Sequence, residues 1–228
     1  MYFKNRAEAG RKLAEKLLQY QTDNVAVVAL SEGAVIVGAQ IAMRLHGSLS
    51  LLLSRGIHLP GEPDPIAAIT SAGTFTKNVM FSVGQLEQFM VDYRSYIEEE
   101  RLHEFHRLNM LISDDGEVKK KYLRRHVVIL VSDGLQNGFS IDVAYDFLKT
   151  VAIKKLVIAS PVASVKAIDR MHLIGDDLCC LDVKPNYIST DHYYDENNLP
   201  EYHSLLKIMK RISTNWRIQP QDFTLVRR

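Results

Sequence analysis

The sequence has few of the residues and segments that mark several common protein classes. Its two cysteines, Cys179 and Cys180, are adjacent, and neighbouring cysteines rarely close a structural disulfide. No apolar run approaches the roughly 18–20 residues that a membrane-spanning helix needs, and the N-terminus lacks the apolar stretch of a secretory signal. These absences predict a cytoplasmic protein in a reducing compartment, without a membrane partner.

Neither sign of charge dominates the chain. The 28 Lys and Arg residues nearly balance 27 Asp and Glu residues, giving a formal net charge of +1. This balance gives no global electrostatic argument for a nucleic-acid partner. The hydrophobic fraction of 46% excludes a disordered chain, and 228 residues at about 150 per domain favour a single domain over residues 1–228.

Buried-strand patterns alternate with helical patterns along most of the sequence. VAVVAL at Val25–Leu30 and HVVILV at His126–Val131 are continuous apolar runs, typical of strands covered on both faces. Each run is followed by a short polar turn and a helical pattern, and two further strands are expected at KLVIAS and DLCCLDV. The opening segment predicts an amphipathic helix that Asn5 caps, with Glu8 as capping-box partner. The expected fold is α/β, with a mostly parallel sheet and helices on both faces.

The middle of the chain breaks this alternation. PGEPDP at 60–65 is a loop that no helix can continue through, and it is followed by two short apolar segments around Gly73. The stretch from Gln85 to Met110 predicts one long amphipathic helix. We interpret residues 60–115 as a hood or lid inserted into the single domain.

Ligands of open α/β sheets bind beyond the carboxyl ends of the strands, which selects two loops. These are Ser31–Gly33 after the first buried run and Ser132–Ser140 after the second. Backbone N–H groups where the second loop enters a helix are suited to a phosphate. The alternative interpretation is that Gly134 and Gly138 only permit a tight turn and Ser140 only caps the helix.

VVILVSDGLQNGFS resembles the signature of type I phosphoribosyltransferases, in which four hydrophobic residues lead to two acidic residues and a Thr-Gly-x-Thr loop. Weaker resemblances to a bacterial subgroup follow in the expected order. They are FKNRAEAGRKLAEKL, VVALSEGAVIVGAQIA, RGIHLPGEPD, IASPVAS and DHYYDENNLPEYHSLL. The resemblance implies a type I phosphoribosyltransferase fold with a small hood. It also implies binding of phosphoribosyl pyrophosphate (PRPP), whose phosphoribosyl group is moved to a nitrogenous base with release of pyrophosphate.

The resemblance also assigns roles to residues. Asp133 is the expected catalytic residue, and Ser31, Glu32, Gly33 and Arg55 are expected on the pyrophosphate side. Mg²⁺ is the expected cofactor if the protein is catalytically active, with no cofactor otherwise and no metal ligand assigned on the chain. The partner is a small phosphorylated ribose, and a homodimer is the default assembly. The phosphate- and PRPP-binding residues are expected to be Ser132, Asp133, Gly134, Gln136, Asn137, Gly138, Phe139 and Ser140.

Three positions depart from the family pattern. Ser132 replaces the first acidic residue of the pair, Glu32 stands where the subgroup has an arginine, and Gly56 stands where it has a lysine. A carboxylate at position 32 repels pyrophosphate, and one charge-assisted hydrogen bond to the ribose is lost at 132. Two hypotheses follow: a phosphoribosyltransferase-like protein that binds PRPP, a ribose 5′-phosphate or a nucleotide with impaired or lost catalysis, or an active Mg²⁺-dependent enzyme.

Two other patterns have simpler interpretations beside the functional ones. Glu99, His103 and His106 lie at helical spacing and could bind a metal, but a solvated helix face is the favoured interpretation. Tyr93 and Tyr96 could stack a base within the hood, although core packing is the simpler role.

Overall fold

The core of the protein is a five-stranded parallel sheet. The structure is a computed structural model that describes residues 2–111 and 118–215. Every neighbouring pair of strands in the sheet is parallel, as the βαβ alternation predicted. In spatial order the strands are β2 (Ser48–Leu51), β1 (Val25–Ala29), β6 (Val127–Val131), β7 (Lys155–Ser164) and β8 (Asp177–Lys184).

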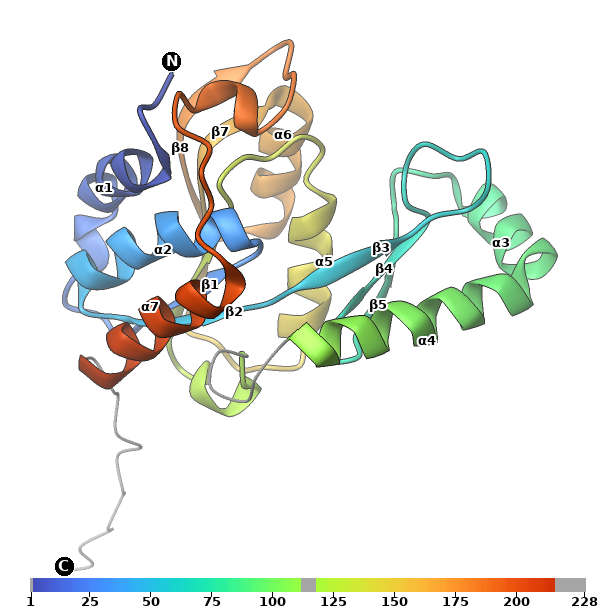
Figure 1. Ribbon diagram of the computed structural model, residues 1–228, viewed down its shortest axis with the longest axis horizontal. Coiled ribbons are helices and arrows are strands. Elements are labelled where there is room, and N and C mark those ends of the chain that lie inside the picture. The colour runs from blue at the N-terminus through green and yellow to red at the C-terminus, as the bar shows by residue number, and fades with distance from the viewer. Residues whose placement is uncertain (1, 112–117, 216–228) are drawn as a thin grey trace, which may run out of the picture.

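Helices cover both faces of this sheet (Figure 1). Alternate residues of β1 point to opposite faces: Val25 and Val27 pack with one set of helices, whereas Ala26 and Val28 pack with the other. The first set is α1 (Arg6–Lys16), α2 (Glu32–Leu45) and α7 (Tyr202–Asn215), and the second is α5 (Phe139–Leu148) and α6 (Val165–Ile174). The continuous apolar character of the central strands is explained because both of their faces are buried.

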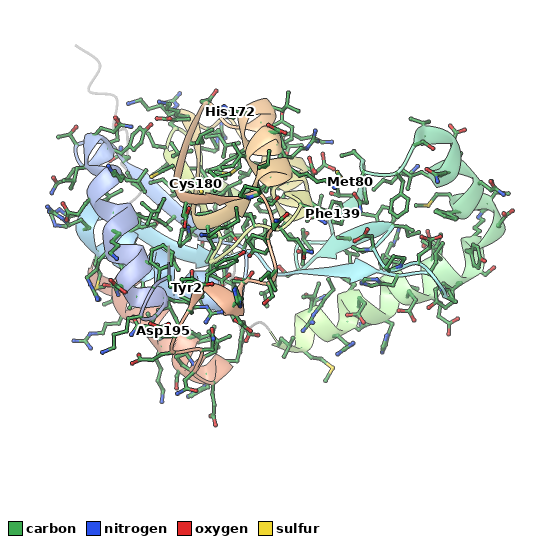
Figure 2. The ribbon with its side chains drawn as sticks, turned by 90° about the horizontal axis from the view of Figure 1, so that it is seen from above. Tyr2, Met80, Phe139, His172, Cys180 and Asp195 are labelled. Atoms are coloured by element: carbon green, nitrogen blue, oxygen red, sulfur yellow. The ribbon has the colours of Figure 1, made fainter. Side chains whose placement is uncertain are left out.

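A smaller unit projects from one side of the core (Figures 1 and 2). It consists of an antiparallel sheet flanked by two helices, and β4 and β5 contact α5 of the core. The expected hood began at residue 60, but β3 already pairs with β4 through Ser54, and residues 112–115 lie outside the described residues. Its elements are β3 (Ser54–Ile57), β4 (Ala67–Thr70), β5 (Phe75–Lys77), α3 (Val83–Asp92) and α4 (Arg94–Leu111).

The helix expected over Gln85–Met110 is two helices instead of one. Tyr93 ends α3 with a non-helical backbone, at φ −113° and ψ 23°, and α4 begins at the next residue. Phe89 on α3 and Ile97 on α4 both pack into the cluster that covers the small sheet. The break allows both helices to bury apolar side chains against the small sheet. No proline or glycine marks the position of this break in the sequence.

The opening helix forms largely as predicted. Asn5 Oδ1 accepts a hydrogen bond from the Glu8 amide at 3.1 Å, whereas Glu8 itself accepts from the Lys4 amide, one residue before the expected partner. Three short 3₁₀ segments complete the described structure, at Leu18–Tyr20, Lys120–Tyr122 and Asp191–Tyr193.

The order of the strands creates a topological switch point between β1 and β6. The chain leaves β1 through α2 towards β2, whereas it leaves β6 through α5 towards β7 on the opposite side. The segments after these two neighbouring strands therefore diverge and open a crevice at their carboxyl ends. Both loops singled out from the sequence, Ser31–Gly33 and Ser132–Ser140, begin at this crevice.

The adjacent cysteines are free thiols on β8, as the sequence predicted for strand residues. Burial raises the pKa of both Cys179 and Cys180 to about 11, which leaves them as protonated thiols near neutral pH. Among the helices of residues 2–111 and 118–215, none combines the length and apolar character needed to span a membrane.

Gly10 provides a test of the close packing of α1 against α2. A Cβ atom at this position would lie 2.7 Å from the backbone oxygen of Val37, which cannot move without distorting α2. We expect Gly10→Ala to lower the free energy of unfolding by about 1–3 kcal/mol, measured by urea denaturation.

Gly84→Ala in α3 is the matched control, because its Cβ would meet no atom within 4 Å. This change should leave stability unchanged or raise it by up to about 1 kcal/mol, since alanine is the better helix former. Equal effects of the two substitutions would contradict the packing described here.

Candidate ligand-binding site

A cavity of about 310 Å³ lies at the switch point. Ser31, Glu32, Gly33 and Arg55, the four residues expected on the pyrophosphate side, all line it together with Asp133. The structure thus brings together residues from the segment after β1, from β3 and from the segment after β6. Ser132 and the residues from Gly134 to Ser140 belong to the adjoining loop and do not line this cavity.

The carboxylate of Asp133 is held by donors on both of its oxygens. Arg6 Nε donates to Asp133 Oδ2 at 2.8 Å, and the Ser31 hydroxyl donates to Oδ1 at 2.7 Å. The Tyr194 hydroxyl donates to the backbone oxygen of Asp133 at 2.5 Å. Burial raises the pKa of Tyr194, with the Asp133 charge adding to the effect, so this tyrosine remains a neutral donor. These hydrogen bonds therefore hold both the side chain and the backbone of Asp133 in place.

Arg6 is the site residue that sequence reasoning missed. Only 4% of its surface is exposed, and besides Asp133 it donates to Asp191 Oδ1 at 2.5 Å and to Asn197 Oδ1 at 3.1 Å. Its guanidinium also lies 4.6 Å from the centre of the Tyr194 ring. Burial alone would lower the pKa of Arg6, but the two carboxylates outweigh it and the pKa is raised.

A signal for Arg6 was present in the sequence. It is the first residue of α1, where the partial positive charge of the helix N-terminus disfavours a cation. Its partners Asp191 and Asn197 lie 185 and 191 positions away, so only the fold reveals that they contact it.

Gly33 permits the close approach of α2 to this ion pair. A Cβ at Gly33 would overlap Asp133 Oδ2 and would lie 2.6 Å from Arg6 Nε. The Ser31 hydroxyl also accepts from the Ala34 amide at 3.0 Å, so it caps α2 while it orients Asp133. The N-terminus of a fourteen-residue helix consequently faces the carboxylate and the cavity.

Hydrogen bonds hold the first half of the loop after β6, residues 132–135, against the core. The Ser132 hydroxyl donates to the Gly134 backbone oxygen at 2.8 Å, so it turns back on its own loop. Leu135 donates to the Val162 oxygen and accepts from the Ser164 amide, which continues the β7 pairing beyond β6. Ser132 is thus a loop-stabilising residue in this structure, and its side chain does not enter the cavity.

The second half of the loop leaves several amides unused. Within the described part of the chain, the amides of Gln136, Asn137, Gly138 and Ser140 donate to no protein acceptor. Only the Phe139 amide is satisfied locally, by Asn137 Oδ1 at 3.1 Å. Gly138 has a φ of +81°, a left-handed conformation that glycine adopts without strain. A run of unmet amides at the start of α5 is an arrangement that suits an anion.

An ion pair between Arg170 and Asp142 lies beside this loop. Arg170 donates through Nε to Asp142 Oδ1 at 2.6 Å, and its Cβ would lie 2.9 Å from a Cβ added at Gly138. Burial raises the pKa of Asp142, although the Arg170 interaction opposes the effect. The ion pair offsets the acidic side chain in the first turn of α5.

Glu32 and Arg55 also line the cavity, but unlike Asp133 they are not held by an ion pair within the described residues. Arg55 is exposed and Glu32 is half-buried, and no ion pair joins them in residues 2–111 and 118–215. Gly56, beside Arg55, packs against Pro65, since a Cβ there would lie 2.9 Å from the proline Cβ. A lysine at position 56 would therefore clash with Pro65 in this packing.

The trio Glu99, His103 and His106 does not form a cluster. The potential ligand atoms that lie within 4.8 Å of one another belong to Glu100, His103 and Glu104. Arg107 already donates to Glu104 Oε1 at 2.8 Å. The sequence favoured a solvated helix face, whereas Glu104 is buried and paired with Arg107.

The comparisons with known proteins agree with this fold. No family model matches the sequence. Two curated proteins from two strains of Mycobacterium tuberculosis, both named "Putative phosphoribosyl transferase", are 26% identical over 181 residues. The match covers 78% of this chain and 40% of each relative, so this chain spans less than half the length of those proteins.

One solved structure extends the likeness over almost the whole chain. The protein TT1426 from Thermus thermophilus superimposes with a TM-score of 0.72 and 24% identity, covering 92% of this chain and 99% of the other. The architecture defines the class as a type I phosphoribosyltransferase fold. The curated relatives support the resemblance of the ordered motifs to phosphoribosyltransferases.

Gly33→Ala tests the geometry around Asp133. The added methyl group would displace the Asp133 carboxylate and Arg6 from each other within a buried space. We expect the free energy of unfolding to fall by about 1–3 kcal/mol, measured by urea denaturation beside Gly84→Ala. A change below about 0.5 kcal/mol, the usual scale of surface substitutions, would show that the pair does not pack against Gly33.

Proposed function

We propose that this chain binds PRPP, a ribose 5′-phosphate or a nucleotide in the crevice between Ser31–Gly33 and Asp133–Ser140, with impaired or lost catalysis. The main support is that the N-terminus of α2 and Asp133 line one cavity, while the adjoining loop leaves unmet amides at the start of α5. The unmet amides at the start of α5 would receive the 5′-phosphate, and Asp133 would receive the ribose hydroxyls. Arg55 and the turn Ser31–Gly33 would face the pyrophosphate.

The departures from the family pattern fall where charge is needed for transfer. Departure of pyrophosphate requires neutralisation of its growing charge, and catalysis by preorganised charges is usually the largest contribution to such a step. Glu32 places a negative charge on the cavity wall, Gly56 supplies no cation, and Ser132 donates within its own loop. These features support ligand binding more than they support efficient transfer.

An active Mg²⁺-dependent enzyme is the second candidate. Glu32 and Asp191 add carboxylates to the cavity that Asp133 lines, and Mg²⁺ is held in proteins by one or two carboxylates together with substrate phosphates. This donor set fits the ion, although Asp133 and Asp191 are already paired with Arg6. Mg²⁺ bound with PRPP would offset the charge of Glu32 and supply the neutralisation that the turn lacks.

The assembly and location predicted from the sequence extend this proposal. The homodimer and the cytoplasmic location stay predictions, as does the view that nucleic acid is not a partner.

Titration calorimetry with PRPP, ribose 5-phosphate and inorganic phosphate, with and without Mg²⁺, separates the two candidates. The binding protein should take up ribose 5-phosphate without metal, because amides and Asp133 need no cation to act. Binding of PRPP only with Mg²⁺, accompanied by pyrophosphate release with a nitrogenous base, would favour the enzyme. The absence of binding by all three ligands would contradict both candidates.

Glu32→Arg tests the unfavourable charge on the pyrophosphate side. We expect this change to raise PRPP affinity by about tenfold, because repulsion becomes a charge-assisted contact. The affinity for ribose 5-phosphate should change little, since that ligand lacks the pyrophosphate. Glu87→Arg, on the exposed side of α3, is the charge-matched control. Equal gains from the two variants would refute a local role for Glu32.

A further inference from the structure

Arg6 is a buried cation whose presence the packing of α1 does not require. Apolar residues such as Leu13 and Leu17 already attach α1 to the sheet. Burying a charge is costly unless other groups hold it, and a cation in the first turn opposes the helix dipole. Arg6 is nevertheless almost completely buried, and each of its three side-chain nitrogens donates one hydrogen bond, to Asp133, Asp191 and Asn197. This arrangement suggests a role at the site beyond packing.

The hydrogen-bonding capacity of Asp133 indicates what that role is. An ionised carboxylate has about four acceptor positions, and Arg6 and Ser31 each occupy one, on different oxygens. About two positions remain on a group that lines the cavity, which matches two neighbouring hydroxyls of a ribose. Donors on both oxygens also fix the plane of the carboxylate, so the remaining positions have defined directions.

Arg6 is poorly suited to bind a phosphate itself. Its charge is offset by two carboxylates, those of Asp133 and Asp191, and its partners use one N–H on each of its three nitrogens. Arg55, which is exposed on β3, is the less engaged cation of the cavity wall. Arg6 would therefore act on a ligand through Asp133.

We propose that Arg6 is the positioning residue of the site: it orients the Asp133 carboxylate for the ribose hydroxyls and ties the segment Asp191–Asn197 to the same carboxylate. This role rests on the proposed function. The N-terminal helix and the segment after β8, which lie far apart in sequence, thereby complete one site. The selectivity that results is for the sugar and not for the phosphate.

Arg6→Ala, Arg6→Lys and Asp133→Asn test this role by calorimetry with two ligands. In Arg6→Ala the affinity for ribose 5-phosphate should fall by about tenfold or more, the effect of losing a hydrogen bond to a charged group. The affinity for inorganic phosphate should stay at the wild-type value, because the α5 amides are untouched. Asp133→Asn should show the same selective loss, and the double variant should lose no more than Asp133→Asn alone.

Free guanidinium ion at millimolar concentration provides a rescue that a purely structural role would not predict. It should occupy the space left in Arg6→Ala and restore binding of ribose 5-phosphate, with no effect on Asp133→Asn. Arg6→Lys keeps the charge but loses the planar fork, so it should fold and still bind the sugar phosphate weakly. If Arg6→Ala does not fold, the measurements on Arg6→Lys replace it. Arg11→Ala, an exposed arginine of the same helix, is the control and should bind both ligands normally.

The outcomes separate this role from the proposed function. If wild-type protein binds neither ligand, the proposed function fails and the role of Arg6 fails with it. If wild-type protein binds ribose 5-phosphate and the folded Arg6 variants bind it equally well, only the role of Arg6 is overturned. Equal losses for both ligands, or no rescue by guanidinium, would also overturn it.

Discussion

The buried ion pair between Arg6 and Asp133 is the interaction on which the geometry of the site depends. It joins the first helix, the end of the central strand β6 and, through Asp191 and Asn197, the segment that precedes α7. A buried pair of this kind contributes little net stability, because desolvation offsets the attraction, but the loss of one partner leaves an uncompensated charge. Its consequence is therefore one defined arrangement of the carboxylate that faces the cavity.

The location of the site was predictable because it follows from strand order and short-range chemistry. VAVVAL and HVVILV identify two buried strands, and the polar turns after them must meet at one edge of a parallel sheet. Ser31, Gly33 and Asp133 consequently lie together as expected. Arg6 was not predictable, since its partners are remote in sequence. The break at Tyr93 was also hidden, because no residue there disfavours a continuous helix.

The departures from the family pattern have different physical meanings once they are placed in the structure. Ser132 stabilises the loop that presents the unmet amides, and Gly56 packs against Pro65, so both fit their surroundings. Glu32 remains a carboxylate on the cavity wall without an ion pair in the described residues. Under the proposed function, ligand binding and phosphoribosyl transfer make separate demands on this crevice, and these residues favour the first.

The most direct measurement is a crystal structure of the protein with ribose 5-phosphate bound. Phosphate oxygens should lie within about 3 Å of the Gln136–Ser140 amides, the distance of an N–H···O hydrogen bond, and ribose hydroxyls should contact Asp133. Sugar phosphate bound elsewhere, or a loop that stays closed by its own side chains at saturating ligand, would contradict the account.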